Sequence, residues 1–535
     1  MTIRKCQAKF LFFAAILVSC VVWLLSAPSD PNRIFAAFPP EVEILSVHDD
    51  LGQRLDSALR NPVVQGLLHA LLKDSSKVIP QPQENAAPVW FRRLCGQRAI
   101  LAVPPREVYG RHVLLFATAC GGWSQRLRWL ATLGRIPAVP AAECDGVTIW
   151  EYVVTSRESG RIFFACMEGA VLGCYGPDPV PLEDAVRRYS RTRSRRMAFL
   201  RLRNRLPSPV PRPSRDRGWV RIEVTDKIQR IDWSVSLLSA EALTLRLSPV
   251  FTQRVDLAPL CASQSWSSRV PCRPAGGETW AVIRIPAPLL GWISEKFRGP
   301  FSALMAACAA TSERLGSDTV DLLIVRSSQA VSDNPGGAVP VLVIPSQAHA
   351  DHRAAFRDGL DVFNRMTGWN LILRPGRSPR SSEGHAASFY SIESGLEGSP
   401  YDRLPEKYHP AFLVLRCGTI LAPRCAFAMP AAAASWTPSP EVAGFLPRGH
   451  SPTLLAARLD LEKLADPLRR IVSLYVLRNL VSGQPEVSRD ALRLLLKTTR
   501  MCTSVLRKTG QVGLLAEVED VARLAVTLEF GRKGL

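Results

Sequence analysis

The sequence predicts an α+β protein with an N-terminal transmembrane helix, followed by antiparallel sheets with helices packed on one face, in two domains or repeated halves. Three observations predict this. Residues 10–27 form an apolar run of 18 residues without a charged side chain, and a helix of that length comes close to spanning a bilayer core. Short strand patterns then occur in runs, with amphipathic helical patterns between them, which is typical of helices layered on antiparallel sheets. Four prolines within residues 206–213 mark a boundary between two halves.

The first segments are expected to be a cytoplasmic head at residues 1–9, a signal-anchor helix at 10–27 and a Pro-rich tether at 28–40. Three basic residues precede the apolar run and few follow it closely. Positive residues favour the cytoplasmic side of a span. We therefore expect a single-pass membrane protein with a cytoplasmic N-terminus and an exported body, which is periplasmic if the cell is Gram-negative.

Two other interpretations of the apolar run stay open. The tetrapeptide LVSC that ends at Cys20 has the pattern of a bacterial lipobox, in which Cys20 is acylated and becomes the new N-terminus. Against it, residues 21–25 continue the apolar run where a polar tether is expected. Ordinary signal cleavage after Ala27 is the third interpretation, and Pro28 directly after the cut disfavours it.

Residues 41–206 are predicted to form the first α+β domain. A two-residue turn at Glu168-Gly169 indicates a hairpin that places Cys166 opposite Val171 and not opposite Cys174. The expected strands cover residues 42–47, 99–103, 113–118, 147–154, 161–167 and 170–175, and the expected helices residues 51–59, 62–72, 123–133 and 182–189.

The rest of the chain is divided into a Pro/Arg-rich linker at 207–217, a second α+β domain at 218–430, an Ala/Pro/Ser linker at 431–452, and a strand–helix segment at 453–535 that packs on the second domain. The Ser/Gly-rich stretch 376–403 is expected to be a long loop. The expected strands cover residues 219–224, 233–238, 242–247, 280–285, 320–325, 338–344, 411–415, 456–461 and 524–530, and the helices 289–297, 301–315, 348–366, 464–480 and 489–509.

One sequence unit recurs: a short strand, a polar or proline step, then an amphipathic helix. It occurs at residues 283–290 and 457–464, and more loosely at 44–51. Its spacing is irregular, so it does not indicate a solenoid.

Residues 163–173, followed by Asp178, Pro179 and Leu182, form a hairpin, a turn and the start of a helix. This step resembles one in a poorly characterised class of bacterial exported, membrane-anchored proteins of unknown function. The resemblance covers the first domain. It implies an exported location and an α+β body, and it implies no chemistry.

The positive charge is concentrated in one stretch. The chain carries a net charge of +20, and residues 187–217 contain 12 Arg and one acid. Such a stretch either is a solvated linker flank or binds an anionic surface, lipid or envelope polymer. Nucleic acid is not expected, because the body is exported and the stretch lacks interleaved aromatic residues. The candidate binding residues are Arg187, Arg188, Arg191, Arg193, Arg195 and Arg196.

One ligand-like cluster is present, at His349, Asp351 and His352. Two histidines three residues apart on a helix can share a metal ion. Catalytic zinc needs a third protein ligand and an open position, and no upstream histidine pair supplies one. The competing interpretation is an ordinary helix N-terminus with exposed imidazoles.

Familiar catalytic motifs are absent from the sequence: there is no CxxC, GxSxG, SxxK, Walker A or GxGxxG pattern. Of 13 cysteines, the pairs Cys261–Cys272 and Cys417–Cys425 are close enough in sequence for local disulfides, and most others are expected to be buried free thiols. No cofactor is predicted.

These observations favour a membrane-anchored, envelope-exposed protein with a non-catalytic binding or scaffolding role. Two alternatives remain. One is an envelope hydrolase with an unrecognised or metal-dependent site near His349 and His352. The other is a lipoprotein, acylated at Cys20, that binds anionic polymer through its Arg-rich stretch.

Overall fold

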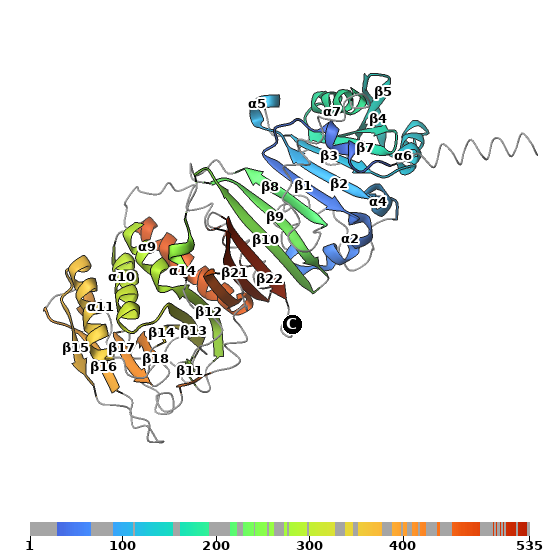
Figure 1. Cartoon of the computed structure of the whole chain (residues 1–535). Helices are drawn as coiled ribbons and strands as arrows, with labels where there is room; N and C mark the ends of the chain where they lie inside the picture. The colour runs from blue at the N-terminus through green and yellow to red at the C-terminus, as the bar shows by residue number, and fades with distance from the viewer. Residues whose placement is uncertain are drawn as a thin grey trace, which may run out of the picture. The chain divides into compact units, whose positions relative to one another are not determined.

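The computed structural model describes residues 29–65, 89–110, 113–153, 161–191, 215–221, 228–239, 241–253, 256–261, 272–274, 278–296, 299–326, 338–345, 351–376, 388–396, 400–403, 409–415, 418–423, 436–438, 452–481, 496, 499, 503, 507, 510–520 and 523–531. The chain divides into two compact units (Figure 1). Unit 1 comprises Met1–Val64, Leu72–Ala240 and Leu245–Thr252, and unit 2 comprises Gln65–Leu71, Glu241–Thr244 and Gln253–Leu535.

Unit 1 is an antiparallel sheet with helices. Its elements are η1 (Arg33–Ala37), β1 (Ile44–Asp49), α2 (Leu51–Arg60), α4 (Val89–Leu94), β2 (Arg98–Val103), α5 (Arg106–Tyr109), β3 (Leu114–Ala119), α6 (Trp123–Thr132), β4 (Ala138–Cys144), β5 (Val147–Tyr152), β6 (Arg161–Met167), β7 (Ala170–Gly176), α7 (Val180–Arg191), β8 (Asp216–Arg221), β9 (Ile228–Leu238) and β10 (Ala242–Phe251), most of which belongs to this unit.

The order of the described strands across the sheet of unit 1 is β10-β9-β8-β1-β2-β3-β7-β6-β5-β4. Strand β1 therefore lies inside the sheet, between β2 and β8. Because β8 pairs with β1, unit 1 continues beyond the Pro/Arg-rich stretch at 207–217. The sequence predicted the domain boundary at that stretch.

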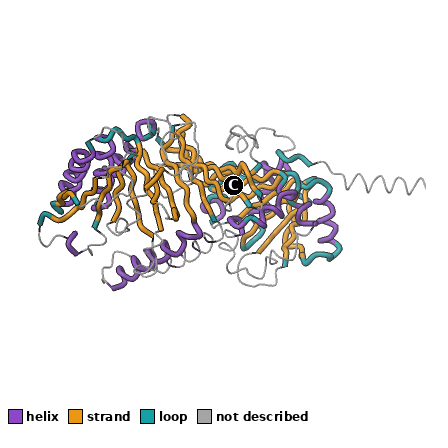
Figure 2. Tube along the Cα trace, turned by 90° about the horizontal axis from the view of Figure 1, so that it is seen from below, coloured by secondary structure: helices purple, strands orange, loops and turns teal. Residues whose placement is uncertain are grey.

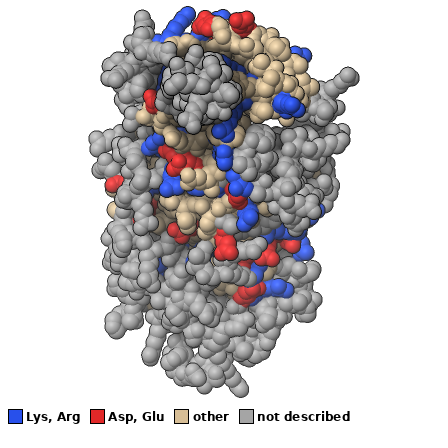
Figure 3. All heavy atoms as spheres, turned by 90° about the vertical axis from the view of Figure 1, so that its right-hand side faces the viewer, with Lys and Arg blue, Asp and Glu red and all other residues tan. Residues whose placement is uncertain are grey.

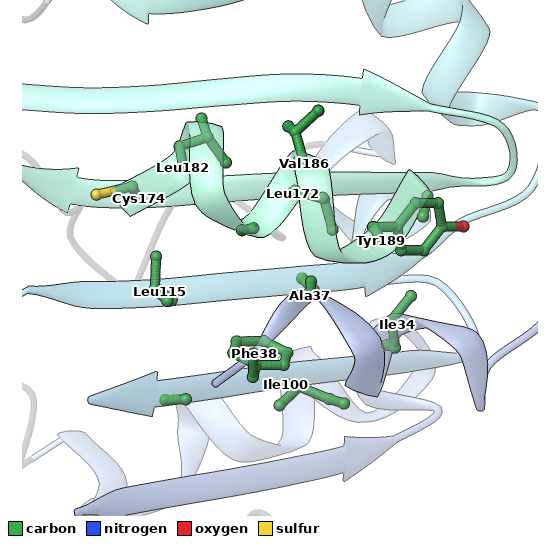
Figure 4. Close-up of a cluster of buried hydrophobic side chains, with 14 of the residues drawn as sticks. Ile34, Ala37, Phe38, Ile100, Leu115, Leu172, Cys174, Leu182, Val186 and Tyr189 are labelled. Atoms are coloured by element: carbon green, nitrogen blue, oxygen red, sulfur yellow. The ribbon is translucent and has the colours of Figure 1, made fainter. Parts of the chain in front are cut away.

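Helices pack on both faces of this sheet. One face packs against α7 and against η1 with the residue that follows it. Phe38 after η1, and Leu182 and Val186 on α7, lie among buried strand residues (Figure 4). The other face packs against α6 through Leu127 and Ala131. The prediction of helices on one face is wrong here. Strands β6 and β7 carry apolar side chains on both faces of the sheet, and a sheet buried on both faces needs a covering layer on each.

The hairpin of β6 and β7 has the predicted register. Cys166 lies opposite Val171, and Met167 opposite Ala170. Gly169 in the turn has φ +70°, a conformation that favours glycine.

Unit 2 repeats the same architecture with other residues. Its elements are η2 (Ala258–Leu260), β11 (Cys272–Pro274), β12 (Glu278–Pro286), α9 (Ala287–Lys296), α10 (Pro300–Arg314), β13 (Thr319–Arg326), β14 (Ala338–Ile344), α11 (His352–Thr367), β15 (Leu371–Pro375), β16 (Ser388–Ser394), η4 (Pro400–Arg403), β17 (Pro410–Leu415), β18 (Gly418–Pro423), β19 (Trp436–Pro438), β20 (Thr453–Asp460), α14 (Leu461–Val481), β21 (Gln511–Asp520) and β22 (Arg523–Gly531).

The main sheet of unit 2 has the order β22-β21-β20-β12-β13-β14-β18-β17-β16-β15 among the described strands. Helices α9, α10 and α11 pack on one face through Leu290, Cys308 and Phe356, while the core on the opposite face is built from strand residues such as Val282 and Leu323. Figure 2 shows strands lying side by side, with helices outside them. The predicted long loop at 376–403 is wrong in part, because β16 lies within it.

An α+β architecture of antiparallel sheets with helices is thus confirmed. The recurring strand–step–helix unit also corresponds to real elements, namely β1 with α2, β12 with α9 and β20 with α14. Among the described helices, none is long and apolar enough to cross a membrane. The predicted signal-anchor at residues 10–27 lies outside the described residues.

Candidate functional site

The candidate site is one face of the sheet in unit 1, around β1. Leu45 and Val47 point into the core, so strand alternation turns Ile44, Ser46 and His48 to the other face. The cross-strand partners on that face include Leu101, opposite Ser46, and Val220, opposite Ile44. We call the surface formed by Ile44, Ser46, His48, Leu101 and Val220 the β1 face.

A chain of hydrogen bonds crosses the β1 face. Ser46 Oγ lies 2.6 Å from His48 Nε2, and His48 Nδ1 lies 2.8 Å from Asp216 Oδ1. Arg54, on α2, donates from Nη1 to Asp216 Oδ2 at 2.6 Å and from Nη2 to Asp216 Oδ1 at 2.9 Å. These contacts join β1, β8 and α2, so the imidazole and the hydroxyl are held in one orientation.

The environment of Asp216 keeps it ionised. Burial by itself would raise the pKa of this carboxyl group, but hydrogen bonds from Arg54 and His48 outweigh burial, and the pKa lies below its usual value. The side chain of Asp216 is only 4% exposed, while that of His48 is 20% exposed. The carboxylate is therefore buried at one end of the chain of hydrogen bonds, and the imidazole of His48 lies nearer to solvent.

Glycines make room for aromatic rings beside this chain. Gly218 lies next to Ser46 on β8, and a Cβ atom there would meet the Trp233 ring at 2.9 Å. Beyond Leu101 on the other side, the ring of Phe116 lies over Gly173. Covering glycines with aromatic rings stabilises a sheet. Here it also sets Ser46 and Leu101 in a row with an aromatic ring on either side.

The order Ser46–His48–Asp216 is that of a nucleophile, a base and an orienting carboxylate. Acyl transfer also needs donors aimed at the developing oxyanion. Strand β1 is paired on both sides, with β2 and β8, so its N–H groups serve the sheet. Asp216 is also shared with Arg54, which weakens its support for a protonated imidazole.

The predicted metal cluster is only partly described. His349 lies outside the described residues. Asp351 is the N-cap of α11, and its Oδ1 accepts a hydrogen bond from the Ala354 amide at 3.0 Å. His352 Nδ1 lies 2.8 Å from Thr419 Oγ1, and burial lowers the pKa of His352. Within the described part of the chain no group of three metal-ligating side chains occurs. The metal site stays a prediction.

Three of the six candidate arginines are described, all on α7. Arg187 contacts Glu183 and Asp184 at 3.3 and 3.4 Å, and Arg188 donates to Tyr109 Oη at 2.9 Å. On the surface shown in Figure 3, the described basic and acidic side chains are intermingled. Arg191 is exposed at the end of α7. The other candidates, Arg193, Arg195 and Arg196, lie outside the described residues, as does the candidate lipidation residue Cys20.

Cysteine chemistry is not supported at the described thiols. Seven described cysteines are buried and form no disulfide. One of them is Cys261, so the local disulfide that the sequence allowed with Cys272 is not formed. Burial raises the pKa of Cys120 to about 11 and that of Cys166 to about 12, so both remain protonated and unreactive near neutral pH. Cys417 and Cys425 lie outside the described residues.

Sequence reasoning missed the β1 face. The available signal was the alternation of Ser46 and His48 with the buried Leu45 and Val47, which sets two polar side chains on one side of an interior strand. The partner Asp216 is 168 residues away, and no local pattern joins it to β1.

Comparison of the chain with protein-family models, with curated proteins and with solved structures finds no match.

Proposed function

We propose that this chain is a membrane-anchored, envelope-exposed protein with a non-catalytic binding or scaffolding role, and that unit 1 binds its ligand on the β1 face. The anchoring rests on the apolar run at residues 10–27 and the basic residues before it. The binding role rests on the side chains of the β1 face. The polar side chains of this face are held by hydrogen bonds, and the aliphatic side chains beside them are accessible to solvent.

One observation carries the binding role. Ile44, Leu101 and Val220 are 39%, 38% and 36% exposed on three neighbouring strands, directly beside the ordered chain of Ser46 and His48. Apolar surface that meets a few fixed polar groups is typical of ligand sites. The ligand expected from this chemistry has an apolar part, which covers the three aliphatic side chains, and a polar group that hydrogen-bonds to Ser46 or His48.

Native mass spectrometry of the full chain, released from its own membranes in detergent, tests the binding role. We expect an added mass on the wild type that Leu101→Arg loses, because a charged side chain then occupies the apolar surface. Leu237→Arg is the matched control, since Leu237 is a leucine of unit 1 that is 50% exposed on β9. A wild type without added mass, or one whose added mass survives Leu101→Arg, contradicts binding on the β1 face.

The anchoring has a separate test. A reporter that is active only outside the cytoplasm, fused after Leu535, is expected to be active in intact cells. Activity of a cytosolic reporter at the same position would contradict the proposed location and leave the binding test unaffected.

A second candidate function is acyl-ester hydrolysis at Ser46. The distances of 2.6 Å from Ser46 to His48 and 2.8 Å from His48 to Asp216 favour it. A fluorophosphonate probe forms a covalent bond with an activated serine. Labelling of the wild type that is lost in both Ser46→Ala and His48→Gln would establish this function, and an unlabelled wild type would remove it.

A further inference from the structure

The C-terminal end of α6 presents apolar side chains to solvent. Trp129 is 37% exposed, Leu130 38% and Leu133 71%. The inner side of the same helix is buried in the sheet core, where Leu127 packs and Ala131 is 3% exposed. Helix α6 is therefore apolar on both sides at this end, and only one side is used by the fold of unit 1. We call the exposed side, Trp129, Leu130 and Leu133 with the following Arg135, the α6 tip.

The α6 tip is held in place by the helix ending. The Arg135 amide donates to the Leu130 carbonyl at 2.8 Å, and the Gly134 amide donates to the Ala131 carbonyl at 3.1 Å. Gly134 has φ +62°. This pair of bonds is the Schellman arrangement, which closes a helix with a glycine in the left-handed region. Leu133 thus projects into solvent from an ordered turn.

Positive charge surrounds the α6 tip. Arg128 and Arg135 are exposed on either side of Leu133. The nearby acid Glu151 lies opposite Val139 on β4, on the face away from α6, and is paired with Arg161 at 3.6 Å. Glu143 and Asp145 lie at the far end of β4, about 17 Å along the strand. Among the described residues, the immediate surroundings of the apolar side chains are therefore basic.

The neighbouring edge strand argues against a second copy of the chain as the occupant. Among the described residues, β4 pairs only with β5. It carries Pro140 and a register shift between Pro140 and Ala142. A proline and a bulge on an edge strand prevent edge-to-edge pairing with another chain. The exposed surface beside β4 is thus protected from strand addition and still open to a partner without strands.

We propose that the α6 tip docks on the surface of an anionic lipid bilayer. Trp129 and Leu133 enter the interface, and Arg128 and Arg135 contact lipid phosphates, as in amphipathic helices that lie in a membrane surface. This inference rests on the proposed membrane anchoring and adds a second contact, which would restrict the orientation of unit 1 on the bilayer.

Hydrogen exchange of the full chain in lipid nanodiscs tests the docking. We expect the peptide that covers residues 127–136 to exchange about tenfold more slowly in phosphatidylglycerol nanodiscs than in phosphatidylcholine nanodiscs. The difference should shrink with added salt and disappear in Leu133→Glu. The matched control is Leu237→Glu, which replaces another exposed leucine of unit 1 and should keep the difference.

The outcomes separate the two proposals. Equal exchange in both lipids, from a chain that enters the nanodiscs, overturns the docking and leaves the anchoring intact. A chain that enters neither nanodisc overturns the anchoring and the docking with it. Protection that appears only as the protein concentration rises, in either lipid, identifies a second copy as the occupant and overturns the lipid proposal.

Discussion

The two units share a strand order and differ in what they bury. Position by position, β10-β9-β8-β1-β2-β3-β7-β6-β5-β4 in unit 1 corresponds to β22-β21-β20-β12-β13-β14-β18-β17-β16-β15 in unit 2. In unit 1 the core on each face includes helix residues, and in unit 2 the described residues of one core all lie on strands. The order of strands is therefore compatible with different covering layers.

A cross-strand ion pair sharpens the comparison. In unit 1 Asp49 on β1 pairs with Arg98 on β2, and in unit 2 Arg284 on β12 pairs with Asp321 on β13. Both pairs join corresponding strands on the face away from the following helix, with the charges exchanged. The side chains of the first pair are 23% and 14% exposed, and those of the second 3% and 0%. The corresponding ion pair is thus partly exposed to solvent in unit 1 and buried in the core of unit 2.

Breaking the buried pair should have the largest effect. Asp321→Asn removes the carboxylate that pairs with the buried Arg284 charge, and we expect it to lower the free energy of unfolding by about 3–5 kcal/mol. Asp49→Asn removes a partly exposed partner and should cost about 1 kcal/mol or less. Urea unfolding of the full chain, with hydrogen exchange to assign each transition to a unit, measures both.

The double variant Arg284→Met with Asp321→Leu is the control. It removes both charges at similar volume, so it should recover most of the stability that Asp321→Asn loses. Equal losses for Asp321→Asn and Asp49→Asn would show that burial does not distinguish the two pairs.

Sequence patterns predicted the elements whose burial is regular. The continuous apolar run of β14 and the start of α2 after β1 correspond to predicted segments. Strand β4 was missed because its residues AVPAAEC include a proline and three alanines and are mostly exposed, which leaves one β-branched residue, Val139, and no apolar alternation. Strand β16 was missed inside a Ser-rich stretch, since its neighbours β15 and β17 supply its pairing.

A smaller loss is expected from Gly173→Ala in unit 1. The added Cβ atom would lie 1.9 Å from Phe116 Cζ, so the ring must leave the row of side chains beside Leu101. We expect the free energy of unfolding to fall by about 1–3 kcal/mol, which is typical of overpacking. Thermal unfolding measures the loss. If Gly173→Ala with Phe116→Ala is no more stable than Gly173→Ala alone, the clash with Phe116 is not the cause.

The candidate site was less predictable than the fold, because its members are joined by the sheet and not by the sequence. The register that sets Asp216 opposite His48 and Gly218 opposite Ser46 depends on β8 joining β1. The Pro-rich stretch before β8 suggested a new domain and so hid that pairing. The predicted ligands His349, Asp351 and His352 had the opposite property: they lie close together in sequence, and of them Asp351 caps α11.

Gly291→Ala in unit 2 should have the opposite sign. Gly291 lies inside α9, and an added Cβ atom would meet only Ala309 Cβ, at 4.0 Å. Alanine favours a helix over glycine, so we expect the free energy of unfolding to rise by about 0.5–1 kcal/mol. Urea unfolding checks the sign. A loss of stability would mean that α9 and α10 pack more closely than these distances indicate.

The smallest expected effect is a loss of stability on acidification, which should begin at a higher pH in unit 2 than in unit 1. Burial lowers the pKa of His352 in unit 2. As the pH falls, the unfolded state therefore takes up a proton at His352 before the folded state does. The contribution of His352 to the free energy of unfolding is therefore complete above the unfolded pKa of about 6.5, and it declines as the pH falls below that value. In unit 1 the pKa of Asp216 is lowered despite burial, because of its bonds to Arg54 and His48. Its contribution persists to about pH 4 and is lost as the pH falls through the folded pKa.

Hydrogen exchange from about pH 7 down to about pH 5, with rates corrected for intrinsic exchange, should therefore show β14 and β18 losing protection before β1 and β8. His352→Asn keeps a polar atom where Nδ1 meets Thr419 and removes the titration, so it should abolish the early loss in unit 2 alone. Asp216→Asn should leave that loss unchanged. Loss of protection in both units together, at one pH, would mean that the two sheets unfold as a single cooperative structure and that their separate titrating groups do not act independently.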